Sequence, residues 1–283
     1  LLASLRRGLT GGVVSDTIAA MLKPMLALGL CLALLGCGGG RPDRSAPVGG
    51  DLTVMSSNFT DADPTDWTGR APERYPVHGI DLSRFQTGVD WPTARANGVN
   101  FAFIKATEGG DLVDPMFKAH WRGAGAAGVK RGAYHFFYHC RPAAEQARWY
   151  IRNVPRTPGA LPPVLDMEWT PTSPTCTLRR DGATIREEAR IFTDIVARHY
   201  GQRPLIYTTV DFYEDNELWR LSGVEFWLRS VAAHPNDRYD GQSWSFWQYT
   251  STGLVPGIAG RVDVNVFAGS KAAWAEWVGA RAL

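Results

Sequence analysis

The chain has 283 residues, of which 45% are hydrophobic and 20% are charged, and its 30 Lys and Arg nearly balance 28 Asp and Glu. These are the proportions of an ordinary globular protein that can bury one sizeable core. The formal net charge of +2, in a sequence without a long basic run, excludes a protein that holds nucleic acid through a charged patch.

The first 37 residues have the pattern of an export signal. A positive charge at Lys23 precedes an apolar run over residues 25–35, which is too short to span a bilayer and has the length of a signal-peptide core. Leu34-Leu35-Gly36-Cys37 resembles the bacterial lipobox, in which the cysteine carries the lipid of the mature protein. We therefore expect a leader over 1–37 and an exported lipoprotein anchored to a membrane of the bacterial cell envelope through Cys37. An ordinary cleaved signal peptide is the alternative.

The domain boundaries follow from composition. The first methionine is Met21, which predicts that residues 1–20 are not translated. Residues 38–75 begin with three glycines, contain scattered Pro, Ser and Asp, and have almost no periodic hydrophobicity, so they predict a flexible tether. One folded domain is expected over 76–283.

Strand-like runs and helical patterns alternate from His78 onward. Strands are expected at residues 80–82, 101–105, 132–137, 164–169, 205–207, 226–228, 245–249 and 262–264. Helices are expected from near Pro92 to Gly98, from Asp114-Pro115 to Gly128, from Pro142 to about residue 153, from Asp181 to Gly201, and around Trp274 and Trp277.

This alternation predicts an α/β protein whose parallel sheet closes into a barrel. The roughly 195 residues over which strands and helices alternate are fewer than the about 250 that eight full strand and helix units usually need. We therefore expect an irregular, flattened TIM-like barrel with short late helices.

Two of the four cysteines lie in the exported domain. Cys140 and Cys176 each follow the end of a strand, and the two strands should be neighbours, so an exported protein can join them in a disulfide. Closing a loop of about 37 residues would contribute about 4 kcal/mol in the chain-entropy model. Two unpaired or metal-binding thiols are the alternative, although a C-x-x-C spacing is missing.

The strand at 164–169 carries the most informative pair of acids. Asp166 and Glu168 share one face of the strand with Val164, because successive side chains on a strand point to opposite faces. At about 5 Å and an effective dielectric of about 20, two carboxylates repel by about 3 kcal/mol, which separates their pKa values by about two units. One acid then keeps its proton near neutral pH, as general acid catalysis of glycoside hydrolysis requires. A solvated or salt-bridged pair is the alternative.

Further acids fall at or just past the ends of other strands. The acids concerned are Asp81, Glu108, Asp166, Glu168 and Asp263, and Gln248 and Tyr249 lie at such an end too. In a barrel of this class the chemistry takes place at the carboxyl ends of the strands. Because like charges at one rim destabilise a protein, their concentration indicates a functional site.

Six motifs occur in an order that resembles a known family. They are His78-Gly79-Ile80-Asp81-Leu82-Ser83 with Gln86 and Asp90-Trp91, Phe103-Ile104-Lys105-Ala106-Thr107-Glu108-Gly109, Gly132-Ala133-Tyr134-His135-Phe136-Phe137, Leu165-Asp166-Met167-Glu168, Trp247-Gln248-Tyr249-Thr250-Ser251 and Val262-Asp263-Val264-Asn265. Over roughly residues 76–270 the chain resembles the glycoside hydrolase family 25 lysozymes, which are N-acetylmuramidases of the Chalaropsis type. The resemblance implies hydrolysis of the β-1,4 bond from N-acetylmuramic acid to N-acetylglucosamine in peptidoglycan, with net retention and with neither metal nor cofactor.

The resemblance also implies roles for individual residues. Glu168 matches the acid/base, and Asp166 matches a second carboxylate that either attacks the anomeric carbon or stabilises the substrate's own 2-acetamido group as the nucleophile. Asp81 and Asp263 match flanking acids. Tyr134, Tyr207 and Trp247 are candidates to stack on a sugar or to position it. Gln248 and Glu108 are further candidates for substrate binding. Lys105 and His135 are expected to be polar neighbours of the site. Arg229 departs from the family, in which a small residue is expected.

Two other functions fit parts of the pattern. One is a non-catalytic lipoprotein that binds peptidoglycan. The other is a chitinase-like retaining glycosidase, which would show further acids two and five residues before Asp166, where this chain has Val164 and Leu161. No repeated wall-binding modules follow the barrel in this sequence, and we expect the lipid anchor to hold the enzyme near the wall in their place. The protein is expected to be a monomer.

Overall fold

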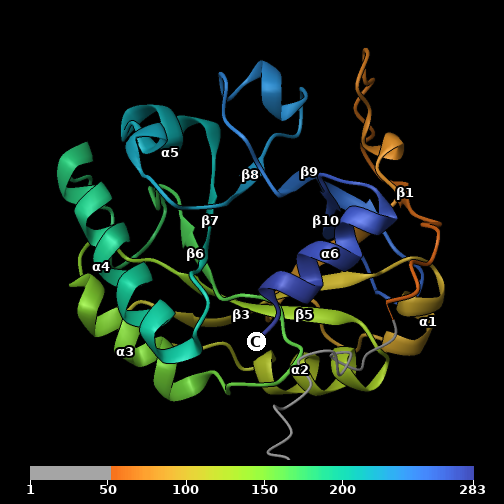
Figure 1. Ribbon diagram of the computed structural model, residues 1–283, viewed down its shortest axis with the longest axis horizontal. Helices are drawn as coiled ribbons and strands as arrows, with labels where there is room; N and C mark the ends of the chain where they lie inside the picture. Colours follow the sequence, from red (N-terminus) through yellow and green to blue (C-terminus); the bar gives the residue numbers. More distant parts are fainter. Residues whose placement is uncertain (1–51) are drawn as a thin grey trace, which may run out of the picture. The chain divides into compact units, whose positions relative to one another are not determined.

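The computed structural model describes residues 52–283, which form an eight-stranded barrel with short helices (Figure 1). The expected leader, the lipidation site at Cys37 and the first part of the expected tether lie outside the described residues. The barrel strands are β2 (His78–Leu82), β3 (Phe101–Glu108), β5 (Lys130–Phe136), β6 (Val164–Met167), β7 (Leu205–Thr208), β8 (Phe226–Arg229), β9 (Phe246–Leu254) and β10 (Val262–Phe267). Neighbours in this order pair with each other, and β10 pairs with β2, which closes the barrel. The fold class expected from the sequence is confirmed.

The last strand corrects the expectation of an all-parallel sheet. The strands from β2 to β9 pair in parallel, but β10 runs antiparallel to both β9 and β2. The physical reason is the connection over residues 255–261, which is too short for a helical crossover and therefore joins antiparallel neighbours. Asp263 consequently lies near the start of its strand, yet it faces Asp81 across the ladder and reaches the same rim.

Helices cover the outside of the barrel. They are α1 (Trp91–Ala96), α2 (Phe117–Ala126), α3 (Ala143–Asn153), α4 (Gly182–Tyr200), α5 (Val210–Asp215) and α6 (Lys271–Arg281), with 3₁₀ turns η1 (Pro72–Arg74), η2 (Leu218–Arg220) and η3 (Pro235–Asp237). The connections after β7 and β8 carry only the six-residue α5 and short turns, as expected, and they rise at the top of Figure 1. In the described part of the chain, no helix is long and apolar enough to cross a membrane.

Local sequence signals set the helix ends. The Asp181 carboxylate accepts a hydrogen bond from the Thr184 amide at the start of α4, and Gly201 ends this helix at a φ of 79°, as the sequence predicts. Helix α2 begins later than expected, with Met116 as its N-cap. Asp114 instead accepts hydrogen bonds from the Arg84 and Met116 amides, and so ties the loop after β2 to the start of α2.

The interior of the barrel is aromatic. Phe103 stacks on Trp227 with ring centroids 4.6 Å apart, and Trp227 meets Tyr207 at 4.5 Å. At the end where β3 begins, Trp274 of α6 packs 5.6 Å from Phe101, so this helix covers that end of the barrel. The aromatic layers therefore fill the barrel up to the rim at which the parallel strands end, and the polar side chains lie at that rim.

Residues 52–75 differ from the expected flexible tether. β1 (Thr60–Asp61) adds an antiparallel strand to β9, and Trp67 packs edge-on against Trp247 with ring centroids 5.2 Å apart. The Asn100 side chain also bonds both backbone groups of Met55, at 2.8 and 2.9 Å. A segment with little periodic hydrophobicity still orders here, because single aromatic residues and an exposed strand edge provide its contacts.

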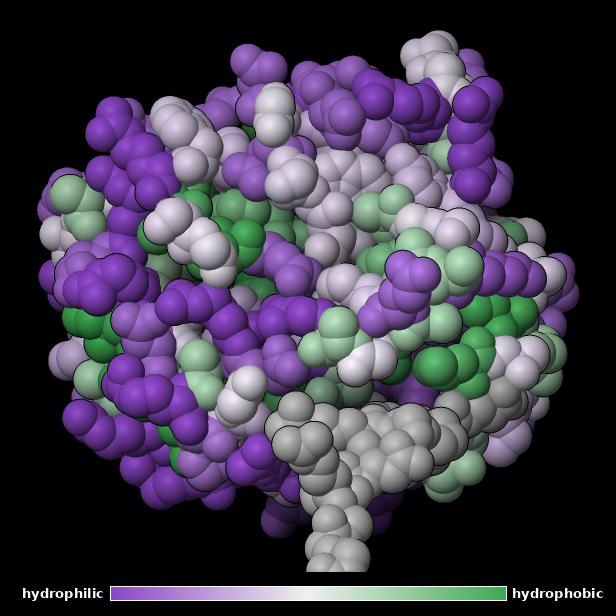
Figure 2. All heavy atoms as spheres, viewed as in Figure 1, coloured by the Kyte–Doolittle hydropathy of each residue, from purple (hydrophilic) through white to green (hydrophobic). Residues whose placement is uncertain are grey.

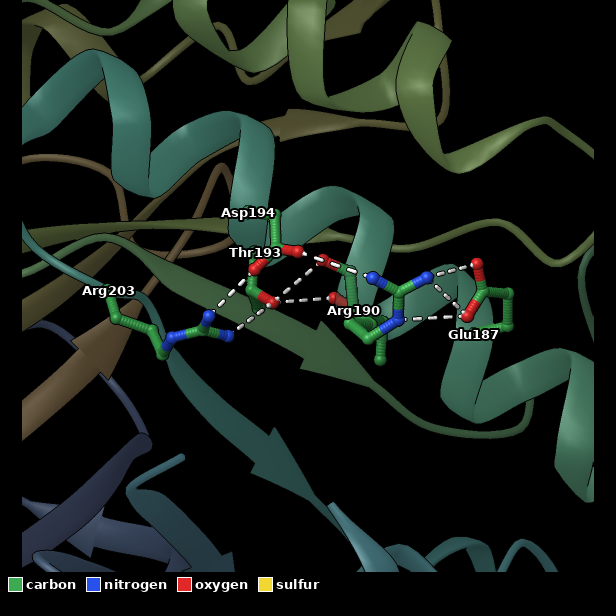
Figure 3. Close-up of polar contacts among 6 residues, drawn as sticks. Glu187, Arg190, Thr193, Asp194 and Arg203 are labelled. Carbon is green, nitrogen blue, oxygen red and sulfur yellow. Dashed lines mark hydrogen bonds and ion pairs between the residues drawn. The ribbon is translucent and has the colours of Figure 1, made fainter. Parts of the chain in front are cut away.

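The disulfide between Cys140 and Cys176 is confirmed, with a Cα–Cα distance of 5.7 Å. It joins the loop after β5 to the loop after β6, next to the strand that carries Asp166. On the face in Figure 2, the described surface is mostly hydrophilic and its hydrophobic residues gather in small groups. The outer side of α4 belongs to this polar surface, where Arg190 pairs with Glu187 and Arg203 pairs with Asp194 (Figure 3).

Candidate active site

Four carboxyl groups meet at the rim where the parallel strands end. Asp81 lies on β2, Asp166 on β6, Glu168 directly after β6, and Asp263 on β10. Val164 belongs to the core inside the barrel, whereas Leu165 and Met167 pack in the outer core, so Asp166 points inward, as the strand alternation predicts. The charge of Asp81 acts on Asp166, and those of Glu168 and Asp263 act on Asp81, which places the four groups in one cluster.

Asp81 is held by two amide side chains from the last two strands. Its Oδ1 accepts hydrogen bonds from Gln248 Nε2 and Asn265 Nδ2, both at 2.8 Å. The two amides are oriented in turn, because Tyr207 Oη donates to Gln248 Oε1 at 3.0 Å and Trp227 Nε1 donates to Asn265 Oδ1 at 2.7 Å. This buried network fixes the position of the Asp81 carboxylate from below.

The Asp166 and Glu168 carboxyls differ in depth. The Asp166 side chain is 5% exposed, and its Oδ1 has no hydrogen-bond partner among the described residues. Glu168 lies nearer the surface, and its backbone carbonyl oxygen accepts a hydrogen bond from His139 Nε2 at 3.1 Å. A buried carboxyl oxygen without a partner is costly in a structural role, but it is available to a substrate or to a shared proton.

Glu108 differs from the four clustered acids in its protonation state. Its carboxylate forms an ion pair of 2.6 Å with Lys105 Nζ and accepts a hydrogen bond from the Tyr138 hydroxyl. Although burial opposes the effect, these two contacts hold the pKa of Glu108 below its ordinary value. Glu108 is therefore ionised at neutral pH, and it holds the Lys105 ammonium, whose charge acts on both Asp166 and Glu168.

Burial raises the pKa of every acid in the cluster. The pKa of Glu168 rises to about 7 and that of Asp263 to about 6, in both cases against the opposing charge of Arg229. Burial, followed by the charges of Asp263 and Glu168 respectively, raises the pKa values of Asp81 and Asp166 well above the ordinary range. Like charges in a site with little water cannot all ionise, so the cluster retains protons at neutral pH.

The position of the proton differs from the simple expectation in which Glu168 is protonated and Asp166 is ionised. Because Asp166 lies deeper, burial favours its protonated form in the substrate-free protein more strongly than it favours that of Glu168. The two acids therefore hold a proton as a coupled pair, in which either carboxyl can carry it. A substrate oxygen beside Glu168 would decide between the two arrangements.

This electrostatic strain predicts a pH-dependent stability. Because folding raises the pKa of Glu168 from 4.5 to about 7, the folded state binds this proton more tightly, and the free energy of unfolding falls as pH rises through that interval. The Glu168→Gln variant loses this component and should be more stable than the wild type at pH 8 by about 2 kcal/mol, after a discount for partial exposure. Urea unfolding at pH 4 and pH 8 measures the difference, which should vanish at pH 4. Equal pH dependence of the two proteins would refute it.

The structure brings most of the expected substrate-binding residues to the rim. Tyr134 and Tyr207 are almost fully buried below the acids, and burial, then the charges of nearby carboxylates, raises the pKa of both hydroxyls, which stay protonated. Gln248 contacts Asp81 directly, as described above. These three side chains can position other groups, but they offer no open ring face on which a sugar could stack.

Two expected residues lie elsewhere. Trp247 is fully buried on the opposite face of β9 from Gln248, where its Nε1 donates to the Ser230 carbonyl oxygen at 2.7 Å and Trp67 covers its ring. The expectation that Trp247 stacks on a sugar is therefore wrong for this structure, because strand alternation turns residue 247 outward. His135 likewise faces outward and stacks on Phe192 of α4 at 5.0 Å.

Four residues at or near the rim were not among the expected catalytic or substrate-binding residues. Asn265 follows Asp263 by two positions and so shares its inward face, a signal that strand alternation already contains. Arg229 and Asp211 act electrostatically on Glu168 from the ends of β8 and the start of α5. Phe85, in the loop after β2, is an aromatic side chain that is 76% exposed. Among residues 52–283, no group of three or more His, Cys, Asp or Glu side chains is arranged to hold a metal ion.

Comparisons with known proteins identify the family to which the sequence is similar. The model of the family described as "Glycosyl hydrolases family 25" matches residues 80–258. Lysozyme M1 of Streptomyces globisporus is 32% identical over 279 residues, which cover 93% of this chain and 91% of that protein. The Escherichia coli (strain K12) protein YegX, described as uncharacterized, is 37% identical over 206 residues, which cover 71% of this chain and 73% of that protein.

Solved structures show the same fold. A family 25 glycosyl hydrolase from Bacillus anthracis superposes with a TM-score of 0.68 at 30% identity, and the match covers 76% of this chain and 99% of that chain. The bacterial lysozyme from Streptomyces coelicolor superposes with a TM-score of 0.64 at 31% identity, covering 72% of this chain and 97% of that chain. In both cases nearly the whole of the solved chain corresponds to the barrel described above.

Proposed function

We propose that this chain, which belongs to glycosyl hydrolases family 25 and is thus a glycoside hydrolase, is an N-acetylmuramidase. Its substrate would be the β-1,4 bond from N-acetylmuramic acid to N-acetylglucosamine in peptidoglycan. The observation that carries the proposal is the cluster of four buried carboxyl groups with raised pKa values at one rim of the barrel. Relatives named as lysozymes support the choice of peptidoglycan.

In the first step Glu168 donates its proton to the glycosidic oxygen as the bond from that oxygen to the anomeric carbon breaks. The bonding electrons stay with the leaving sugar, which departs with the new proton. The anomeric carbon is attacked either by an Asp166 oxygen, which gives a glycosyl ester, or by the carbonyl oxygen of the substrate's 2-acetamido group, which Asp166 then stabilises.

In the second step Glu168 acts as a base. Its carboxylate takes a proton from a water molecule, whose oxygen attacks the anomeric carbon from the side that the leaving sugar vacated. The covalent bond to Asp166 or to the acetamido oxygen breaks, and the product has the original configuration. Because Glu168 ends the cycle protonated, a pKa of about 7 suits both halves of its role.

The neighbouring residues would orient the charges. Asp81 and Asp263 keep the cluster short of full ionisation, since burial raises the pKa of each. Tyr207 and Gln248 hold Asp81 in place through the hydrogen bonds described above, and Phe85 takes the role of sugar platform that Trp247 does not fill. Glu108 holds the Lys105 ammonium, which limits the rise in the pKa of Asp166.

The location of the substrate implies export. Peptidoglycan lies outside the cytoplasm, and the disulfide between Cys140 and Cys176 suits an oxidising compartment. We infer that the segment ending at Cys37 directs export and carries the lipid that anchors the enzyme to the membrane, and that the enzyme acts there as a monomer.

A substrate comparison tests the proposal. The purified protein should release soluble fragments from peptidoglycan and should leave chitin oligosaccharides intact, and reducing-end and mass measurements follow both reactions. Cleavage of chitin alone would favour the chitinase-like alternative. Binding to peptidoglycan without release of any fragment would favour the non-catalytic alternative.

A further inference from the structure

A hollow lies at the carboxyl ends of β7 and β8, and β7 neighbours the strand that carries Asp166. It has a volume of about 310 Å³ and lies between the segments that follow β7 and β8, where Asp211, Glu214, Arg229 and Arg238 contribute charged side chains to its wall. The strand ladder aligns Met167, Thr208 and Leu228, so the residues that follow them, Glu168, Thr209 and Arg229, lie at neighbouring strand ends. Thr209 and Arg229 line the hollow, which therefore lies beside the strand end of Glu168, where a substituent of a bound sugar would extend.

Arg229 has a fixed backbone, and its guanidinium has no direct hydrogen-bond or ion-pair partner among the described residues. Its carbonyl oxygen accepts a hydrogen bond from Tyr239 Oη at 2.6 Å, and the following amide, of Ser230, donates to the Gln248 carbonyl oxygen at 3.0 Å. Within residues 52–283 the Arg229 guanidinium forms no salt bridge, whereas Asp211 on the opposite wall accepts a hydrogen bond from Thr209 Oγ1 at 2.6 Å.

A positive charge beside the acid cluster would help an anionic substrate to bind. Four carboxyl groups at the rim repel an anionic substituent on the substrate, and N-acetylmuramic acid carries a lactyl group that is either a free carboxylate or the attachment point of an acidic peptide stem. A guanidinium presents two parallel N–H groups that match a carboxylate, and an arginine that has no salt bridge of its own is free to form that pair.

We propose that Arg229 binds a carboxylate carried by the muramoyl sugar or its peptide stem in this hollow, and that it selects glycans that bear this charge. The inference rests on the proposed function and deepens it. It assigns a substrate contact to a position at which the family resemblance leads one to expect a small residue.

A cycle of two enzymes and two substrates tests the contact. The first substrate is a set of glycan strands whose peptides have been removed, so that the lactyl carboxylates are free, and the second is the same set with these carboxyls converted to methylamides. Wild type should lose about 10- to 100-fold in kcat/KM on the methylamide substrate, which is the usual worth of a hydrogen bond to a charged group. Arg229→Ala should cleave the two substrates with similar kcat/KM, because the contact is absent, whereas a loss that arises from the missing charge beside Glu168 lowers both values by the same factor and leaves their ratio unchanged.

Two further variants keep the test decisive. Arg229→Lys retains the charge without the paired N–H groups, and its selectivity should fall between the wild type and Arg229→Ala. Arg122→Ala removes an exposed arginine of α2 and should leave selectivity unchanged. Coupling that appears only with intact peptide stems would assign the carboxylate to the stem rather than to the lactyl group.

The outcomes separate this inference from the proposed function. A wild type that cleaves the carboxylate and methylamide forms with equal kcat/KM both with and without peptide stems, or an Arg229→Ala variant that loses the same factor on both forms, would overturn the carboxylate contact and leave the muramidase intact. A wild type that cleaves no peptidoglycan would overturn the proposed function and this inference with it.

Discussion

Replacement of Glu168 by glutamine should lower kcat on peptidoglycan by about 10²- to 10⁴-fold, because an amide cannot donate the proton that the leaving oxygen needs. Binding should change little, since the side chain keeps its shape, so KM should stay within a few-fold of wild type. Release of reducing ends from purified peptidoglycan, measured as a function of substrate concentration, gives both constants.

The matched control for this variant is Glu187→Gln. Glu187 is an exposed glutamate of α4 that pairs with Arg190 at 2.6 Å, as Figure 3 shows, and its loss should leave kcat unchanged. Full activity of Glu168→Gln would remove Glu168 from the reaction and would leave Asp263 and Asp81 as the remaining candidates for the proton donor.

Replacement of Asp166 by asparagine should reduce kcat by about 10³-fold, a loss typical of removing a group that stabilises charge in the transition state. Asparagine can neither form a glycosyl ester nor carry the negative charge that would stabilise an attacking acetamido group. Because the wild-type carboxyl is buried and its pKa is raised, the variant should unfold no more readily than the wild type at neutral pH. Steady-state rates together with thermal unfolding distinguish loss of chemistry from loss of fold.

A second reagent separates the two possible roles of Asp166. A thiazoline analogue of the cyclised 2-acetamido sugar should inhibit the wild type strongly if the substrate supplies the nucleophile, and weakly if Asp166 attacks directly. Asp194→Asn, on the outer face of α4 where Asp194 pairs with Arg203 at 2.7 Å, is the control and should behave as wild type (Figure 3). Unchanged activity of Asp166→Asn would contradict both roles.

Strand alternation was the most informative part of the sequence. It correctly predicts that Asp166 and Val164 point into the barrel and that Leu165 points outward. The same rule, applied to β10, also places Asn265 in the site. The ends of α4 are equally predictable from the sequence. Asp181 caps the first turn with its carboxylate, and Gly201 adopts the positive φ at which the helix ends, and few other residue types do either. These features depend on neighbours in sequence, which is why sequence alone predicts them.

Features that depend on distant partners were harder to read. The direction of β10 follows from the short connection before it, yet its place between β9 and β2 appears only when the barrel closes. Trp247 was expected at the sugar because of its residue type, although Trp67, 180 positions away, covers it. Proton positions in the acid cluster depend on burial depth, which the spacing of two acids on one strand does not specify.

If the acid cluster is that of a muramidase, it breaks the bond between the anomeric carbon of N-acetylmuramic acid and the glycosidic oxygen, which leaves N-acetylmuramic acid at the new reducing end. The most direct measurement digests purified peptidoglycan with the wild type, reduces the fragments with borohydride, and identifies the reduced terminal sugar by mass spectrometry. Muramitol is expected at the new ends. Glucosaminitol there, or no new reduced ends at all, would contradict it.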